Sequence, residues 1–257
     1  MAPTRPSQPR ARSRSGSLTE AANRAAWDAR ADEYQLKHDE FLRGGDSWGL
    51  WQIPEAELRV LGDVAGMDVL ELGCGAARFS IALGSRGARC VGVDNSARQL
   101  EHARSNGADF PLVHAAAEDV PLPDASFDIM FSDHGAFSWG DPERVVPEAA
   151  RLLRPGGLLA FNVSSPFAQV CYDEAADADS ERLQRPYFGL RRIDDGDGAA
   201  TYNLAYGEWI AVLRAHGLVL ERLIEPQPPE GATTTYGVDP AWARRWPAEC
   251  IWVSRKS

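Results

Sequence analysis

The chain contains 257 residues, of which 44% are hydrophobic and 25% are charged, so it has ample apolar material for a core. Its formal net charge of -10 argues against nucleic acid as the main partner, because phosphate binding requires a basic surface. No apolar run approaches the roughly 18 residues that a membrane span requires, so no membrane partner is expected.

Residues 1–17 are rich in Pro, Ser and Arg and hold no acidic residue. This composition predicts a disordered basic tail, with an arm that contacts a partner as the alternative. The tail has no apolar stretch, so a secretory signal is not expected. The cysteines show no paired spacing, which predicts reduced thiols in a cytoplasmic protein rather than a disulfide framework or zinc site. They are Cys74, Cys90, Cys171 and Cys250.

Helical periodicity dominates residues 18–65, which we interpret as an N-terminal helical cap. One helix is predicted over residues 18–42, and a second over about 54–64, where Pro54 suits the first turn. The glycine-rich loop between them carries Trp48 and Trp51. These side chains either pack in the core or roof a ligand pocket, since large aromatics on a flexible loop suit both roles.

Residues 66–164 alternate between strand and helix patterns, which predicts a parallel sheet. The predicted strands cover residues 68–72, 89–94, 110–114, 127–131 and 158–163, and the predicted helices cover 76–85, 96–105 and about 145–153. Residues 165–206 are interpreted as an insertion that covers a substrate. Residues 207–257 hold a predicted helix at 207–216 and predicted strands at 219–224 and 250–253. Residues 18–257 are therefore expected to form a single domain.

A glycine turn follows the first predicted strand and opens a helix. Glu71, Gly73 and Gly75 alternate there, and the glycines let the backbone approach a ligand closely because no Cβ intervenes. A dinucleotide fold requires a third glycine where this chain has Arg78, which disfavours a dehydrogenase. The turn instead resembles the acidic-x-Gly-x-Gly-x-Gly turn of class I S-adenosylmethionine-dependent methyltransferases, with Ala77 in place of the third glycine.

Asp94 ends the second predicted strand, at the place where the resembled family has a hallmark acid. A carboxylate there can accept both ribose hydroxyls of an adenosine held over the glycine turn. The alternative is an aspartate that caps the next helix. The backbone of Asn95 and Ser96 is expected to lie against the adenine.

Two further segments resemble the same family. Residues 114–128 resemble its Asp-Ala-Glu-x-Leu-Pro-Phe-x-x-x-x-Phe-Asp segment, with Ala117 and Glu118 at matching positions. Ala116 departs from it, because the family commonly places there the Asp that receives the adenine amino group. A backbone carbonyl or Glu118 is the expected substitute. Residues 153–158 resemble its Leu-Lys/Arg-Pro-Gly-Gly turn, which has a purely structural role.

The resemblance implies a fold class, a cofactor and a set of binding residues. The expected fold class is α/β, a seven-stranded, mostly parallel Rossmann-like sheet with helices on both faces, an antiparallel last strand and an N-terminal helical lid. The expected cofactor is S-adenosyl-L-methionine, with S-adenosyl-L-homocysteine as its product and no metal. The predicted cofactor-binding residues are Tyr34, Glu71, Gly73, Cys74, Gly75, Asp94, Asn95, Ala117, Glu118 and Ser132.

The methyl acceptor is expected beyond the carboxyl ends of the fourth and fifth strands, where open α/β sheets bind ligands. His134 is the candidate catalytic base because an ordinary histidine pKa is near neutrality, and the alternative is a histidine that only shapes the pocket. The run at residues 194–198 resembles a calcium loop but lacks its full ligand spacing, so a hairpin turn is expected. The predicted substrate-binding residues are Trp48, Trp51, Asp133, Phe137, Ser165, Tyr172 and Tyr206.

The predicted activity is methyl transfer to O, N or C of a small-molecule metabolite or natural product by direct displacement. The enzymatic alternatives act on a peptide or protein terminus or on RNA. From a different class, a regulatory module could retain the cofactor pocket without turnover. The protein is expected to be a monomer or a homodimer.

Overall fold

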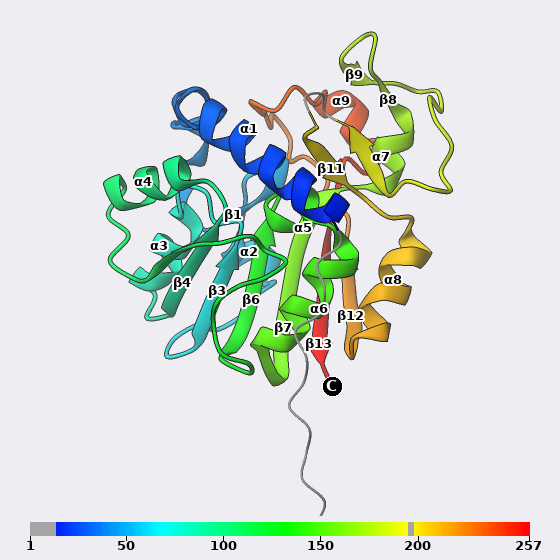
Figure 1. Cartoon of the computed structure of the whole chain (residues 1–257). Helices are drawn as coiled ribbons and strands as arrows, with labels where there is room; N and C mark the ends of the chain where they lie inside the picture. Colours follow the sequence, from blue (N-terminus) through cyan, green and yellow to red (C-terminus); the bar gives the residue numbers. More distant parts are fainter. Residues whose placement is uncertain (1–13, 195–197) are drawn as a thin grey trace, which may run out of the picture.

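A seven-stranded sheet forms the centre of the computed structural model, which describes residues 14–194 and 198–257 (Figure 1). The strand order is β12-β13-β7-β6-β3-β4-β5, and β13 alone runs antiparallel to its neighbours in this sheet. This arrangement confirms the predicted, mostly parallel sheet with an antiparallel last strand. The strands are β3 (Asp68–Leu72), β4 (Arg89–Asp94), β5 (Leu112–His114), β6 (Phe127–Asp133), β7 (Leu153–Ser164), β12 (Leu218–Ile224) and β13 (Glu249–Lys256).

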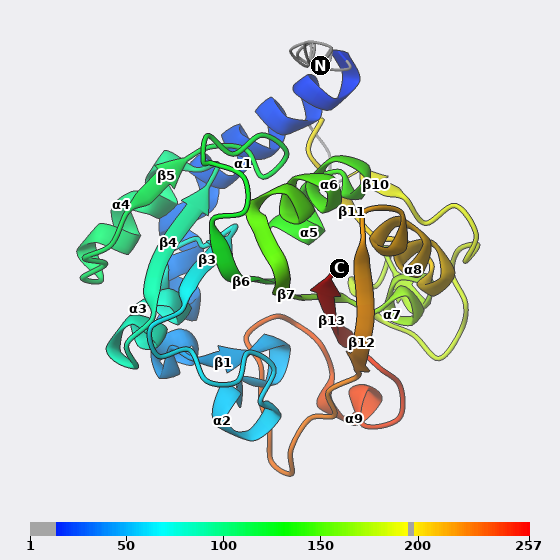
Figure 2. The same ribbon diagram turned by 90° about the horizontal axis from the view of Figure 1, so that it is seen from below.

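Helices cover both faces of the sheet, as predicted (Figure 2). On one face, α6 (Pro142–Leu152) and α8 (Tyr206–Ala215) pack against the strands through side chains such as Val146 and Trp209. On the other face, α3 (Arg78–Ser85) contributes Phe79 to a second buried cluster. The helix α4 (Ala97–Ser105) contacts β4 and β5 at the sheet edge.

The long helix α1 (Arg14–His38) starts before the predicted residue 18 and forms the expected N-terminal lid. Figure 1 shows it lying across the end of the sheet at which β3 and β6 finish. Asn23 anchors α1 by donating hydrogen bonds to the carbonyls of Trp139 at 2.7 Å and Ala200 at 2.9 Å. The predicted disordered tail falls mainly on residues 1–13, which lie outside the described residues.

The second predicted helix is much shorter than expected. Only α2 (Glu55–Leu58) forms, and Arg59 then adopts a left-handed conformation with φ of 48°. The carboxylate of Glu55 accepts the backbone N–H groups of residues 60–62 at 2.8 to 3.2 Å. A side chain thus replaces the helical carbonyls as acceptor, and the chain turns away.

The strand β7 begins at Leu153, earlier than the predicted residue 158. The expected turn at residues 153–158 lies inside this strand as an irregularity, where Gly156 has a φ of 78°. The register with β6 shifts at the same point, between Phe127 and Ile129. A bulge therefore accommodates the Pro-Gly-Gly segment without ending the strand. The other predicted elements are present with ends shifted by a few residues.

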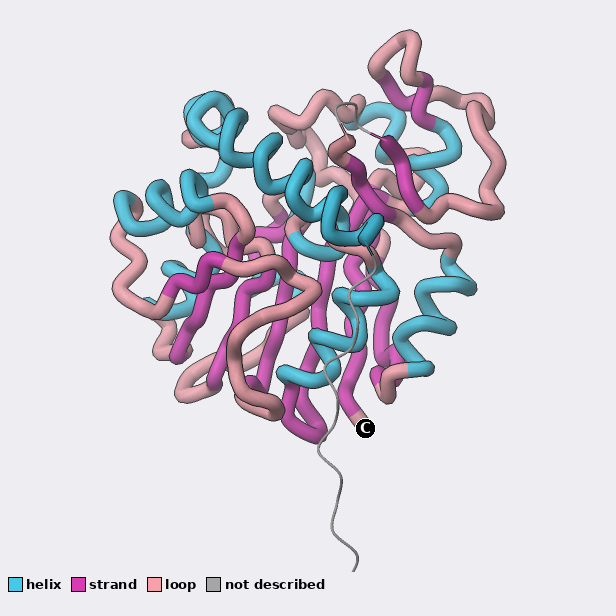
Figure 3. The backbone as a smooth tube through the Cα atoms, in the orientation of Figure 1, coloured by secondary structure: helices cyan, strands magenta, loops and turns pink. Residues whose placement is uncertain are grey.

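The predicted insertion, residues 165–206, contains α7 (Pro166–Cys171) and two short hairpins (Figure 3). The hairpins pair β8 (Tyr172–Asp173) with β9 (Ala178–Asp179), and β10 (Arg192–Asp194) with β11 (Ala200–Tyr202). Residues 195–197 of the expected hairpin turn lie outside the described residues, although β10 and β11 flank them as a hairpin requires. The remaining short elements are η1 (Phe41–Gly44), β1 (Ser47–Trp48), η2 (Gly49–Trp51), β2 (Ile53–Pro54), α5 (Ala136–Trp139) and α9 (Pro240–Ala243).

The described part of the chain has no helix with the length and apolar character needed to span a bilayer. The four cysteines are free and buried.

Candidate functional site

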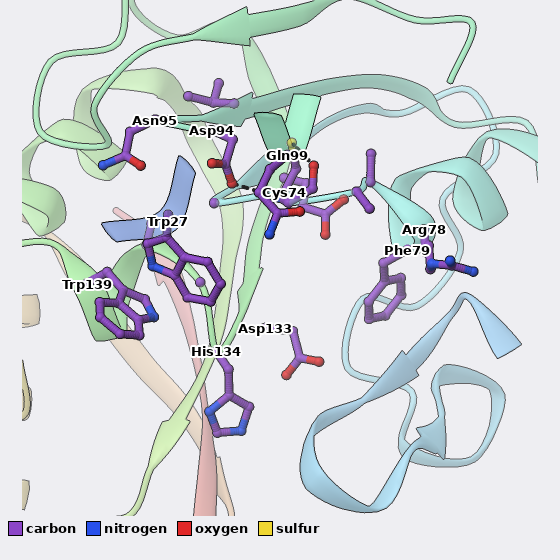
Figure 4. A pocket seen from close by; sticks show the side chains of 18 of the residues that line it. Trp27, Cys74, Arg78, Phe79, Asp94, Asn95, Gln99, Asp133, His134 and Trp139 are labelled. Carbon is purple, nitrogen blue, oxygen red and sulfur yellow. Dashed lines mark hydrogen bonds between the residues drawn. The ribbon is translucent and has the colours of Figure 1, made fainter. Parts of the chain in front are cut away.

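A cavity lies at the carboxyl ends of β3, β4 and β6 and is covered by α1 (Figure 4). Asp94 and Asn95 lie at one end of the cavity, and Asp133 and His134 lie at the other. The predicted cofactor-binding residues that line it are Tyr34, Glu71, Gly73, Cys74, Gly75, Asp94, Asn95, Ala117 and Glu118. The fold thus brings together side chains from four separate stretches of the sequence.

The glycine turn after β3 has the backbone conformation that its sequence predicts. Gly73, Gly75 and Ala77 have φ angles of 74°, 50° and 54°, in the region that favours glycine. A Cβ on Gly73 would lie 2.4 Å from the amide nitrogen of Ala136, so the turn packs directly against α5. Ala77 holds the left-handed position before α3, which accounts for the glycine that is usual there in the resembled family.

Asp94 is held in place by backbone groups on both sides. Its Oδ2 accepts the Gly75 amide at 2.7 Å, and its Oδ1 accepts the Ser96 amide at 2.8 Å. Burial raises the pKa of Asp94 although these two bonds oppose the rise. The cap of α4 is Ser96, whose hydroxyl accepts the Gln99 amide, so the alternative reading of Asp94 as that cap is wrong.

Glu71 presents a buried carboxyl group to the cavity from β3. Its Oε2 accepts both the amide and the hydroxyl of Ser80. Burial raises the pKa of Glu71 to about 8, and the charges of Asp133 and Asp94 act in the same direction. The group is therefore largely neutral at pH 7 and can gain negative charge when a cation binds beside it.

Trp27 of α1 and Trp139 of α5 form an aromatic wall that the sequence analysis missed. Both rings line the cavity, and they meet edge to face with centroids 5.0 Å apart (Figure 4). Trp27 falls within the helix predicted over residues 18–42. Its partner lies far along the sequence, so only the fold reveals the pair.

Glu118 is the acidic residue nearest in the sequence to Ala116, where the chain differs from the segment of the resembled family. Ala116 does not line the cavity, whereas Ala117 and Glu118 do. The Oε1 atom of Glu118 accepts the amide of Asp141 at 3.3 Å, and burial raises the pKa of Glu118. Glu118 thus lines the cavity, and its role as a substitute acceptor for the adenine amino group stays a prediction.

Ser132 does not line the cavity, which corrects its predicted place in the cofactor site. Its side chain is fully buried, and a Cβ on Gly135 would lie 3.0 Å from its hydroxyl oxygen. Side chains alternate along a strand, so Asp133 faces the cavity while Ser132 turns into the protein. Tyr34 lines the cavity, and its hydroxyl lies 2.8 Å from that of Tyr236.

Asp133 and His134 belong to a buried hydrogen-bond network at the end of the cavity opposite Asp94. The Nε2 atom of His134 lies 2.8 Å from Oε2 of Glu249 on β13. The side-chain amide of Asn162 on β7 donates to Asp133 at 2.9 Å and to Glu249 at 2.7 Å. Sequence reading missed Glu249, because an acid at the start of a distant strand carries no local signal of a site.

The same network reaches the N-terminal cap through backbone groups. The Gly49 amide donates to Asp133 at 2.9 Å, and the Leu50 amide donates to both carboxylate oxygens of Glu249 at 3.0 Å. Burial lowers the pKa of His134, but the hydrogen bond and charge of Glu249 and the charge of Asp133 outweigh it and raise the pKa overall. Burial raises the pKa of Asp133.

Trp48 and Trp51 pack in the core, so the alternative of a pocket roof is wrong. Trp48 is 1% exposed, meets Phe79 edge to face at 5.2 Å, and donates its indole N–H to Glu55 at 2.7 Å. Trp51 is also buried, in a separate cluster that includes Trp242. The cavity wall here is formed by neighbouring residues of the loop, Ser47, Gly49 and Gln52.

Four other predicted substrate residues do not line the cavity. Phe137 is fully buried and stacks on Phe161 with centroids 4.1 Å apart. Ser165 caps α7 by accepting the Ala168 amide at 2.9 Å. Tyr172 donates to Asp177 within its own exposed hairpin. Tyr206 lies on α8 and donates to Glu225 at 3.2 Å, so the predicted role of the insertion as the cavity cover is not seen in these residues.

The loop between β12 and α9 takes the place expected for the insertion. Tyr236 lines the cavity, and its ring stacks on His38 of α1 with centroids 4.4 Å apart. Thr235 adds a hydrogen bond of 2.6 Å to Nδ1 of His38. This loop contains Pro and Gly without an apolar period, so its sequence gave no signal of the contact.

Within the described residues, no group of three or more His, Cys, Asp or Glu side chains is arranged to hold a metal ion.

Known proteins resemble this chain in sequence over its core. The family model described as "Methyltransferase domain" matches residues 70–161. An uncharacterised methyltransferase of Mycobacterium tuberculosis is 36% identical over 111 residues, which are 43% of this chain and 42% of that protein. A demethylmenaquinone methyltransferase of Clavibacter sepedonicus is 34% identical over 140 residues, which are 53% of this chain and 56% of that protein. The chain thus spans about half the length of these curated relatives.

A solved structure resembles the chain over nearly its whole length. It is the 1,6-didemethyltoxoflavin-N1-methyltransferase of Burkholderia thailandensis, with bound 1,6-didemethyltoxoflavin and S-adenosylhomocysteine. The TM-score is 0.60 at 17% identity, covering 98% of this chain and 93% of that chain. At this identity the likeness shows the fold, and it confirms the Rossmann-like architecture.

Proposed function

Because this chain belongs to the class I S-adenosylmethionine-dependent methyltransferases, we propose that it transfers a methyl group from S-adenosyl-L-methionine to a small molecule. The bound cofactor would supply an electrophilic methyl group on a sulfonium centre. The work left to the protein is to hold, align and desolvate the two reactants. Small-molecule acceptors are named for relatives such as the demethylmenaquinone and didemethyltoxoflavin enzymes.

The observation that carries this proposal is the corner formed by Gly75 and Asp94. The carboxylate of Asp94 faces the cavity with each oxygen already fixed by one backbone N–H group. Each carboxylate oxygen retains a lone pair, so the two oxygens can accept hydrogen bonds from two neighbouring hydroxyls such as those of a ribose. Gly75 lines the same space and has a positive φ of 50°.

The donor and acceptor groups beyond this corner fit the rest of the cofactor. Glu71 and Asp133 supply acidic groups for an ammonium or sulfonium charge, and both line the cavity. The Oε1 atom of Gln35 is buried without a hydrogen-bond partner in the same wall, so it is available to a ligand donor. Faces of Trp27 and Tyr34 can stabilise a cation by about 0.5–2 kcal/mol.

The covered position of the cavity suits a displacement reaction. The lid α1 and Tyr236 enclose the space, which removes water and restricts the approach of the acceptor. Alignment of two bound reactants can contribute about 7–11 kcal/mol to the lowering of the barrier. We propose His134 as the base at the acceptor end, because it lines the cavity opposite Asp94 (Figure 4).

Titration calorimetry with the full chain tests the cofactor assignment. We expect S-adenosyl-L-homocysteine to bind with one site per chain and NAD not to bind. Labelled S-adenosyl-L-methionine incubated with a metabolite extract should then yield products heavier by one methyl group. Absence of binding of both S-adenosyl compounds would refute the proposed function.

A further inference from the structure

The carboxylate of Glu249 lies directly behind His134, on the one strand that runs antiparallel to the rest of the main sheet. We infer that Glu249 is a positioning residue that holds His134 as the base for an acceptor whose nucleophilic atom carries a proton. The acceptor class is therefore an O–H or N–H compound. This inference rests on the proposed methyl transfer and narrows its substrate.

The hydrogen bonds around Glu249 determine which nitrogen of His134 carries the ring proton. Oε2 of Glu249 accepts from Asn162 at 2.7 Å and lies 2.8 Å from Nε2 of His134, while Leu50 donates to both oxygens. A carboxylate only accepts hydrogen bonds, so the ring proton is placed on Nε2. Nδ1 of His134 is left with its lone pair, and this is the atom that can take a proton.

The backbone of His134 is held in place as well as its ring. His134 has a φ of 48°, and its amide donates to the carbonyl of Asn162 at 3.0 Å. The Asn162 side chain bridges Asp133 and Glu249, so three adjacent strands set the position of one ring. The side chain of His134 is 27% exposed, whereas that of Glu249 is fully buried. The ring is thus the member of the pair that an acceptor can reach.

A second buried carboxylate shows what a purely structural acid looks like in this protein. Glu55 is 1% exposed and accepts from the Trp48 indole and from backbone N–H groups. It does not line the cavity. Glu249 is as deeply buried, but one of its hydrogen bonds goes to a titratable ring at the cavity wall. This difference points to a role of Glu249 in proton transfer.

Two acids beside His134 favour the imidazolium that proton transfer would create. Glu249 and Asp133 are the acids that act on the ring, whereas Glu71, which lines the same cavity from β3, is largely neutral at pH 7. The hydroxyls of Tyr34 and Tyr236 close the space from α1 and the loop before α9. Burial disfavours the charged ring, but the combined effect of the Glu249 and Asp133 carboxylates is larger, so the pKa of His134 is raised.

The reaction that follows balances in atoms and charge. The acceptor O–H or N–H bond breaks, its proton goes to Nδ1 of His134, and its electron pair forms the new bond to the methyl carbon. The bond between that carbon and sulfur breaks, and its electrons return the sulfonium to a neutral thioether. His134 then releases the proton to solvent, which restores the base.

The first test reads the ring directly and needs no acceptor. Full-length protein with ¹⁵N-labelled histidine is titrated by long-range ¹H–¹⁵N NMR, and His134→Gln assigns the signal. We expect the neutral ring to carry its proton on Nε2 in the wild type. Glu249→Gln should lower the pKa of His134, because it removes the negative charge that raises this pKa. The matched control Glu55→Gln should leave the pKa of His134 unchanged. An unchanged His134 titration in Glu249→Gln, or a proton on Nδ1 in the wild type, would overturn the inference.

The second test separates positioning from folding in turnover. A panel of phenols, N–H heterocycles and pyridine, which has no proton on nitrogen, is offered with labelled S-adenosyl-L-methionine. Glu249→Gln should lower kcat at least about tenfold and move the acid limb of kcat/KM to lower pH. Its affinity for S-adenosyl-L-homocysteine should stay within about twofold, and Glu249→Asp should recover part of kcat. Methylation of pyridine in preference to the proton-bearing compounds would contradict the inference.

The two proposals fail in different ways. If the wild type does not bind S-adenosyl-L-homocysteine, the proposed methyl transfer itself is refuted. Normal binding with unaltered His134 titration in Glu249→Gln would leave methyl transfer standing and remove only the role of Glu249.

Discussion

Gly49 packs directly against the carboxylate of Glu249. A Cβ built on Gly49 would lie 2.0 Å from Oε2 of Glu249, and the φ of Gly49 is 67°. The loop of the N-terminal cap therefore approaches the acceptor end of the cavity without a side chain between them. This contact joins the lid region to the network that holds His134.

Gly49→Ala should disturb both the loop and the network. The added methyl group must displace Glu249 or the backbone, and the left-handed conformation adds strain of about 1 kcal/mol or more. We expect kcat to fall at least about tenfold, while S-adenosyl-L-homocysteine affinity changes less, since Asp94 lies at the other end. Steady-state kinetics and calorimetry measure the two quantities. Gly62→Ala is the matched control, because Gly62 also has positive φ but nothing lies within 4 Å of its Cβ position.

Asp94→Ala should weaken the binding of S-adenosyl-L-homocysteine by at least about tenfold. The variant loses charge-assisted hydrogen bonds to two hydroxyls, each contributing roughly 1.5–3 kcal/mol. Calorimetry of the full chain measures the change. Asp239→Ala provides the control, since Asp239 also accepts a backbone amide but caps the distant helix α9. Equal affinity in wild type and Asp94→Ala would remove Asp94 from the proposed ribose site.

Glu71 should make the stability of the ligand-free protein depend on pH. Its pKa rises from an ordinary 4.5 to about 8 in the folded state, so folding favours the protonated form. The stabilisation is fully present below the unfolded pKa and is lost as pH rises through the folded pKa. Relative to wild type, Glu71→Gln should gain on the order of 4 kcal/mol between about pH 5 and about pH 8.5. Urea unfolding at both pH values gives the difference, and parallel curves for the two proteins would contradict this account.

Trp48 and Trp139 should respond differently to truncation. Trp48→Ala removes a core side chain packed on Phe79 and Phe131, and it should lower the free energy of unfolding by about 3–5 kcal/mol. Trp139 lines the cavity, so Trp139→Ala should instead weaken S-adenosyl-L-homocysteine binding with a smaller loss of stability. Urea unfolding and calorimetry on both variants separate the effects. If Trp48→Ala leaves the free energy of unfolding unchanged but weakens S-adenosyl-L-homocysteine binding, Trp48 is part of the cavity wall and not of the core.

The cofactor end of the cavity was predictable because its signals are local. The turn at Gly73 and Gly75 requires positive φ, and glycine is the residue that adopts it readily. Asp94 follows a buried strand, and the carboxyl ends of adjacent parallel strands meet at one edge. A short stretch of residues therefore determines both the backbone shape and the place of the acid.

The end of the cavity proposed for the acceptor was predicted less well, because its residues depend on how separate segments face one another. Alternation along β6 requires Asp133 and Ser132 to point to opposite faces, but the sequence alone did not show which of the two faces the cavity. The aromatic residues of the insertion suit a cavity wall by composition, yet Tyr172 and Tyr206 bind their own neighbours. The loop that holds Tyr236 does the covering instead.

The amino-acid sequence by itself determined the alternating sheet, the glycine corner and the acid beside it, since period, turn chemistry and strand ends are properties of contiguous residues. Only the tertiary structure decided that Glu249 stands behind His134 and that Trp48 is part of the core. Those relations arise where β13 inserts antiparallel beside β7 and where the cap loop folds onto it. Pairings across such distances follow from the packing of whole faces, which no local pattern encodes.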